Sequence, residues 1–146
     1  MFEEKEGNKS LIYANLTYKI IGMAYKVYNM IGPGFQEKYY QRALKNVFKK
    51  EGLSFLEQVR VDFVLNGENI GKYYIDFVID DKVVLELKSK NFFSRKDVKQ
   101  VLGYLKKSGL EVGLLIAFSI SAPAFSSMAV SPSLNAISVI FSYSER

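Results

Sequence analysis

The stretch YYIDFVIDDKVVLELK, residues 73–88, decides the fold, because it reads as two short strands joined by a polar turn. Apolar side chains alternate with polar ones along both strands: Ile75, Phe77, Ile79, Val83, Leu85 and Leu87. Burying these two apolar sets together sets Ile75 opposite Leu87 and Phe77 opposite Leu85, since a shift of one residue sends every side chain to the other face. The same register places Asp76 directly across from Glu86, with Lys88 one step along. The apolar pattern therefore predicts a cluster of two carboxylates and one lysine.

Asp76 and Glu86 are suitable ligands for a divalent cation. Two carboxylates across a hairpin can hold one such ion, completed by water and by the backbone carbonyl of Leu87. The ion polarises a phosphoryl oxygen and lowers the pKa of bound water, while Lys88 orients that water or stabilises charge in the transition state. The alternative is structural, because Glu-x-Lys on a strand is common on the solvated face of a sheet.

Composition narrows the chemistry that such a site can perform. The chain has no cysteine and no histidine, which excludes disulfides, thiolate metal sites, imidazole acid–base catalysis and histidine-bound zinc or iron. A catalytic metal would have oxygen ligands, which favours Mg²⁺ or Mn²⁺. The formal net charge of +5 leans weakly towards acidic partners such as nucleic acid.

Length and hydropathy point to one domain spanning residues 1–146. A hydrophobic content of 49% is ordinary for a soluble globular protein of this size. The first residues are acidic and lack the apolar core of a signal peptide, and no apolar run is long enough to span a bilayer. We therefore expect a cytoplasmic protein that has no membrane partner.

Hydrophobic periodicity predicts the elements around the hairpin: helices over 10–31, 35–51 and 94–107, and strands over 55–65 and 110–118. The tail differs in character, since it is rich in serine and no charged residue occurs from Val112 to Ser144. One interpretation is a loop, confined by Pro123 and Pro132, followed by an edge strand over 136–143. The other is a tail that has diverged and packs poorly.

Further motifs occur on both sides of the hairpin. Asp76-x9-Glu86-x-Lys88 resembles the PD-(D/E)xK nuclease signature, with Ile75 in place of the proline. Upstream, residues 34–40 (GFQEKYY) match the pattern G-x-x-E-x-x-Y; downstream, residues 100–105 (QVLGYL) resemble the Q-x-x-x-Y motif of exonuclease-type members, and 113–118 resembles the strand that follows it. In this order the motifs resemble the GxxExxY family, a branch of the PD-(D/E)xK nuclease superfamily, over about residues 16–118. The tail, 119–146, shows no such pattern.

The resemblance implies an α/β fold of the α+β kind: a mixed sheet in a restriction-endonuclease-like αβββαβ core, here with an extra N-terminal helix. It implies a metal-dependent nuclease in which Glu37 joins Asp76 and Glu86 as a metal ligand. It also implies that Gln100 and Tyr104, which share a helix face, position the water, the lysine or a phosphate. Structural explanations remain open for each, since a first-turn Glu37 complements the helix dipole and a helix edge accommodates Gln100 and Tyr104.

Basic residues follow the hairpin and are predicted to track a phosphate backbone: Lys90, Arg95, Lys96 and Lys99. For any one of them, the alternative is a solvated helix face. Phe92 and Phe93 are candidates for contact with a base or a sugar. The leading hypothesis is a Mg²⁺- or Mn²⁺-dependent phosphodiesterase acting on DNA. The rivals are a catalytically inactive module that binds nucleic acid or protein, and a subunit that works as a homodimer through its aromatic first helix.

Overall fold

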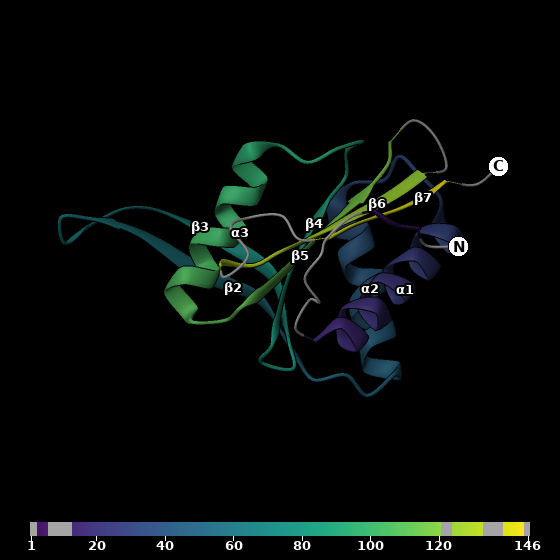
Figure 1. Ribbon diagram of the computed structural model, residues 1–146, viewed down its shortest axis with the longest axis horizontal. Helices are drawn as coiled ribbons and strands as arrows, with labels where there is room; N and C mark the ends of the chain where they lie inside the picture. The colour runs from purple at the N-terminus through teal and green to yellow at the C-terminus, as the bar shows by residue number, and fades with distance from the viewer. Residues whose placement is uncertain (1–2, 6–12, 121–123, 133–138, 145–146) are drawn as a thin grey trace.

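A single mixed β-sheet runs through the computed structural model, which describes residues 3–5, 13–120, 124–132 and 139–144. Its strand order is β1-β7-β6-β5-β4-β3-β2, with α1 and α2 on one face and α3 on the other (Figure 1). The elements, in chain order, are β1 (Glu3–Lys5), α1 (Ala14–Ile31), α2 (Glu37–Lys50), β2 (Phe55–Leu65), β3 (Glu68–Ile79), β4 (Val83–Lys88), α3 (Arg95–Ser108), β5 (Val112–Phe118), β6 (Ala124–Val130) and β7 (Val139–Ser144).

The segment from α2 to β5 has the order helix, three strands, helix, strand, and α1 precedes it. The strands β2, β3 and β4 are antiparallel neighbours, whereas β4 and β5 are parallel because α3 crosses over between them. The predicted αβββαβ core with an extra N-terminal helix is therefore confirmed. The helix predicted from residue 10 is described from Ala14 onward, because residues 10–12 lie outside the described part of the chain.

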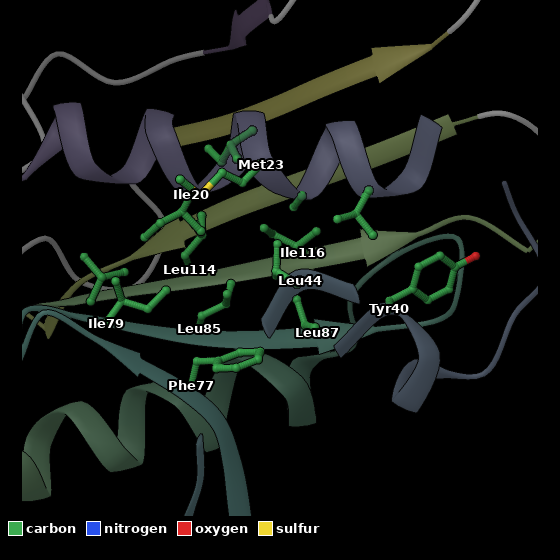
Figure 2. Close-up of a cluster of buried hydrophobic side chains, with 14 of the residues drawn as sticks. Ile20, Met23, Tyr40, Leu44, Phe77, Ile79, Leu85, Leu87, Leu114 and Ile116 are labelled. Carbon is green, nitrogen blue, oxygen red and sulfur yellow. The ribbon is translucent and has the colours of Figure 1, made fainter. Parts of the chain in front are cut away.

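The hairpin of β3 and β4 has the predicted register where the ladder is formed, with Phe77 opposite Leu85 and Ile79 opposite Val83. Figure 2 shows side chains from both strands in one cluster with Leu44 of α2. Burial of these side chains removes apolar surface from water, which is the main force that holds the helices on the sheet.

The prediction fails two residues before this ladder, at Ile75. Its side chain packs under α3 in the second core cluster, whereas Leu87, its expected partner, lies in the first. The ladder between β3 and β4 ends at the pair Phe77–Leu85. Gln58 of β2, which lies opposite Asp76, has a φ of 51°. This backbone conformation breaks the regular alternation of side chains between the two faces along β2. The strands β3 and β4 therefore separate at Asp76, and the side chain of Ile75 faces α3 instead of the first core cluster.

Beyond this point β2 and β3 continue as a two-stranded arm that projects past α3 (Figure 1). Asn66 and Gly67 form its turn with φ values of 50° and 80°, as expected for a hairpin loop of this composition. A bulge between Phe63 and Val64 shifts the register along the arm. The Lys107 ammonium at the end of α3 donates to the Asp62 carbonyl, so the helix is tied to the arm.

The tail does not follow the loop that we predicted between Pro123 and Pro132. Residues Ala124–Val130 form β6, which pairs with β5 on one side and β7 on the other. Phe125 and Ala129 are buried, and the Phe125 ring contacts Phe118 and Tyr28. Residues of β6 belong to both core clusters, so both faces of the strand are covered and charged residues are unfavourable in it. The two prolines flank the strand in the sequence without interrupting it. The predicted last strand corresponds to β7, but it is not an edge strand, because β1 pairs with it on the side away from β6. Residues 136–138 lie outside the described part.

None of the helices in the described segments is both long enough and apolar enough to cross a lipid bilayer.

Candidate active site

Asp76 and Glu86 converge where the β3–β4 ladder ends. The Asp76 N–H donates to Glu86 Oε1 at 3.1 Å, and the Leu87 N–H donates to Asp76 Oδ2 at 2.7 Å. Each carboxylate thus accepts a hydrogen bond from the backbone of the opposite strand, and Glu86 is only 4% exposed. The predicted convergence of the two carboxylates is confirmed, while their catalytic role stays a prediction.

Burial raises the pKa of both carboxyl groups of this pair above their ordinary values. Burial, followed by the charge of Asp76, raises the pKa of Glu86 to about 9. Burial also raises the pKa of Asp76, against the opposing effect of hydrogen bonds from its neighbours and the charge of Lys88. At neutral pH the pair therefore holds a proton, and a cation bound between the carboxylates would replace it.

Gln58 is a member of the site that sequence reasoning missed. It lies on β2 across from Asp76, since Glu57 pairs with Phe77 and Val59 pairs with Ile75. Its side chain hydrogen-bonds the Asp76 carboxylate, which lowers the Asp76 pKa against the larger effect of burial. A φ of 51° costs a non-glycine residue about 1–2 kcal/mol. Such a backbone conformation beside an acidic pair is typical of a functional site.

Lys88 points from the end of β4 towards the start of α3, and its side chain is 20% exposed. Its ammonium lies 3.7 Å from the Asp97 carboxylate, and its charge lowers the pKa values of Asp76 and Glu86 against the larger effects that raise them. Lys88 is thus the cation shared between the carboxyl pair and Asp97.

Asp97 is a second residue that sequence reasoning missed. It is buried in the first turn of α3, where its carboxylate accepts from the Ser94 N–H while the Ser94 hydroxyl accepts from the Asp97 N–H. It also forms an ion pair with Lys90. Burial alone would raise the Asp97 pKa, but the bonds from Lys90 and Ser94 outweigh it and the pKa is lowered. The sequence signal was the capping pattern of Ser94 followed three residues later by an acid.

Glu37, the first residue of α2, lies at the same end of β4. Its carboxylate accepts from the Ser89 N–H at 3.2 Å, and the Ser89 hydroxyl donates to the Phe35 carbonyl. Within the described part of the chain, no three acidic side chains are grouped closely enough to hold a metal ion. The structure thus brings Glu37 next to the residue after Lys88 but not into one group with Asp76 and Glu86, and its role as a ligand stays a prediction.

Tyr40 explains the tyrosine of the G-x-x-E-x-x-Y motif in physical terms. Its hydroxyl donates to the Gly32 carbonyl at 2.7 Å and accepts from the Phe35 N–H at 3.3 Å. Its ring stacks on Phe118 with the centroids 4.1 Å apart. Tyr40 therefore fixes the loop that leads into Glu37, because it is anchored in the core while its hydroxyl holds both ends of that loop.

Gln100 and Tyr104 of α3 lie on the side of the sheet that carries the carboxyl pair. The Tyr73 hydroxyl donates to the Gln100 carbonyl at 3.0 Å. Burial raises the pKa of Tyr73, and the charges of Glu86 and Tyr104 add to this, so these three side chains are electrostatic neighbours. Tyr73 thus lies between α3 and the carboxyl pair, while the assisting roles of Gln100 and Tyr104 stay predictions.

The predicted phosphate-binding residues divide into two groups. Lys90 is engaged by Asp97. Arg95, Lys96 and Lys99 instead line an open pocket of about 430 Å³, together with Gln100 and Phe63. Phe92 is 76% exposed and does not line this pocket, whereas Phe93 packs against the second core cluster.

Comparison with protein families gives one match. The model of a family described as the PD-(D/E)XK nuclease superfamily matches residues 14–126 of the sequence. No curated protein and no solved structure gives a significant match.

Proposed function

Because this chain belongs to the PD-(D/E)XK nuclease superfamily, we propose that it is a metal-dependent nuclease that hydrolyses phosphodiester bonds in DNA. The observation that carries the proposal is the buried pair of Asp76 and Glu86, each bonded to the opposite strand, with Lys88 beside them. Such a pair has an evident structural cost, since two buried carboxyl groups repel and resist ionisation. A reaction that needs those oxygens provides a reason for the cost.

The carboxyl pair fits Mg²⁺ or Mn²⁺. The two carboxylates that meet there offer oxygen donors, and their pKa values are raised mainly by burial, which the charge of Lys88 offsets only in part. Mg²⁺ usually keeps several waters and needs only one or two carboxylates from a protein. An ion bound there would act as a Lewis acid on the phosphoryl group and lower the pKa of a bound water. We include Glu37 and the Leu87 carbonyl in the proposed ligand set.

The remaining residues are assigned roles from their positions. In hydrolysis a water oxygen bonds to phosphorus, the bond from phosphorus to the leaving sugar oxygen breaks, and negative charge grows on the phosphoryl oxygens. Lys88 would stabilise that charge. Asp97 would keep the Lys88 ammonium directed to its place. Gln100 and Tyr104 would position the substrate or the water from α3.

The proposal is tested by incubating the purified protein with labelled linear, circular and branched DNA, in magnesium, in manganese and in EDTA. We expect cleavage only with metal. Glu86→Gln, which keeps the size of the buried side chain, and Lys88→Ala should each abolish cleavage while both variants remain folded by circular dichroism. Glu57→Gln, at an exposed acid on β2, is the matched control. Cleavage by Glu86→Gln at the wild-type rate would rule out the assignment.

A second candidate is a module that binds nucleic acid without cutting it. The ion pair between Lys88 and Asp97 favours it, because the lysine is already engaged. This candidate predicts salt-dependent DNA binding that is indifferent to chelator and no product with any divalent metal.

A further inference from the structure

An open pocket lies between α3 and the projecting β2–β3 arm. Its helical wall consists of Arg95, Lys96, Lys99 and Gln100, and its opposite wall is Phe63. Among the described residues, none of the three cations forms an ion pair. Three like charges within five residues of one helix repel, so an anion bound in the pocket would relieve the helix of that repulsion.

Phe63 gives the pocket an aromatic wall. Phe63 is 45% exposed, although its ring packs on Tyr73 with the centroids 4.9 Å apart and the planes tilted by 35°. Gly71 lies opposite Phe63 on β3 and leaves the ring without a side chain across the strand. The arm therefore presents one face of an aromatic pair to the pocket while Tyr73 supports the other.

A phosphate site beside an aromatic face matches the chemistry of an unpaired nucleotide. Single-stranded nucleic acid is bound by a cationic groove that follows the backbone and by aromatic rings on which the bases stack. A volume of about 430 Å³ is in the range of small-ligand pockets. A base inside a duplex is stacked on both faces and paired at its edge, so it cannot enter without being displaced.

We propose that this pocket binds an unpaired nucleotide of a single-stranded or frayed DNA substrate, with the base stacked on Phe63 and the phosphates held by Arg95, Lys96 and Lys99. The inference rests on the proposed nuclease function and names the substrate class. Tyr73 connects the pocket to the carboxyl pair, since its ring contacts Phe63, its hydroxyl donates to the Gln100 carbonyl, and Asp76 follows three residues later on the same strand. A strand held here is therefore presented to the Asp76–Glu86 site.

The test is fluorescence anisotropy in EDTA with a labelled thymidine strand of about 12 nucleotides and with a duplex of the same length. We expect the single strand to bind more tightly than the duplex. Phe63→Ala should weaken single-strand binding roughly 5- to 100-fold and leave duplex binding nearly unchanged. Phe63→Trp should restore the affinity. Phe63→Leu, which keeps an apolar side chain on the arm, separates the loss of stacking from loss of the fold and should remain weak.

Tyr74→Ala is the matched control, because it removes an exposed aromatic side chain of the same arm that does not line the pocket, and it should bind like the wild type. Tighter binding of duplex than of single strand, or equal weakening by Tyr74→Ala and Phe63→Ala, would overturn the inference. Since EDTA removes cleavage, the two proposals fail separately. If binding depends on Phe63 but no cleavage occurs, the proposed nuclease function is wrong. If cleavage requires Glu86 but binding does not depend on Phe63, only the proposal for this pocket is wrong.

Discussion

The buried carboxyl pair makes the stability of the metal-free protein depend on pH. Burial, followed by the charge of Asp76, raises the Glu86 pKa from 4.5 to about 9. A group whose pKa is raised on folding contributes its full stability below the unfolded pKa and loses it as the pH rises through the folded pKa. We therefore expect the metal-free protein to lose stability between pH 4.5 and about pH 9.

The magnitude follows from the width of that window. Each pH unit between the two pKa values costs about 1.36 kcal/mol. The loss from Glu86 is therefore about 3 kcal/mol between pH 4.5 and neutral pH and about 6 kcal/mol by pH 9, and Asp76, whose pKa is also raised, acts in the same direction. A loss of about 3 kcal/mol lowers the melting temperature of a domain of this size by about 10 °C. Asp97, whose pKa is lowered, adds stability only above its unfolded value of 3.8 and leaves this window unchanged.

The assay is chemical unfolding in EDTA from about pH 5 to about pH 9 for the wild type, Glu86→Gln and Glu57→Gln. Glu86→Gln removes one of the two titrating carboxyl groups and should reduce the slope, with the remainder due to Asp76, whereas Glu57→Gln should keep the wild-type slope. Millimolar magnesium should raise the melting temperature of the wild type most at high pH, because the cation replaces the proton of the pair. A wild-type curve that rises with pH, or an unchanged slope in Glu86→Gln, would refute the reasoning.

Two further predictions concern residues around the pair. Asp97→Asn weakens both the cap of α3 and the ion pair with Lys88, so we expect urea unfolding to show a loss of about 1–2 kcal/mol and kinetics to show a fall in kcat. Ser94→Ala removes only a capping bond and should lower stability alone. Equal kcat values in the two variants would contradict a positioning role for Asp97. Gly113→Ala would place a Cβ in steric conflict with Val101 Cγ1, where α3 packs on β5, so unfolding should show a loss of about 1–3 kcal/mol. Wild-type stability would contradict this packing.

The hairpin was predictable because its information is local. Alternation of apolar residues determines which residues face the core, and this fixed Phe77 opposite Leu85 and brought Asp76 to Glu86. The neighbouring strand was harder. Counting from the turn at Asn66-Gly67 pairs Asp76 with Glu57, but the bulge between Phe63 and Val64 moves the register by one. No periodicity in the sequence predicts that bulge, and so the position of Gln58 opposite Asp76 was missed.

The other misses have a similar origin. The residues of β6 are uncharged because the strand packs on both core clusters, yet the same serine-containing composition on its own resembles a loop. Asp97 was readable as a cap, but its ion pairs with Lys88 and Lys90 depend on how α3 is set against β4. Sequence patterns describe what one element needs, whereas contacts between elements depend on their placement.

The carboxyl pair also replaces part of the sheet. Where β3 and β4 separate, the N–H groups of Asp76 and Leu87 donate to side-chain oxygens of the opposite strand. Buried N–H groups must be bonded, so the carboxylates close the sheet at the point where its ladder stops. This fixes both side chains before any cation arrives, and little conformational entropy is left to lose on binding. The order of the site therefore comes from the hairpin, and a metal ion would change its charge more than its shape.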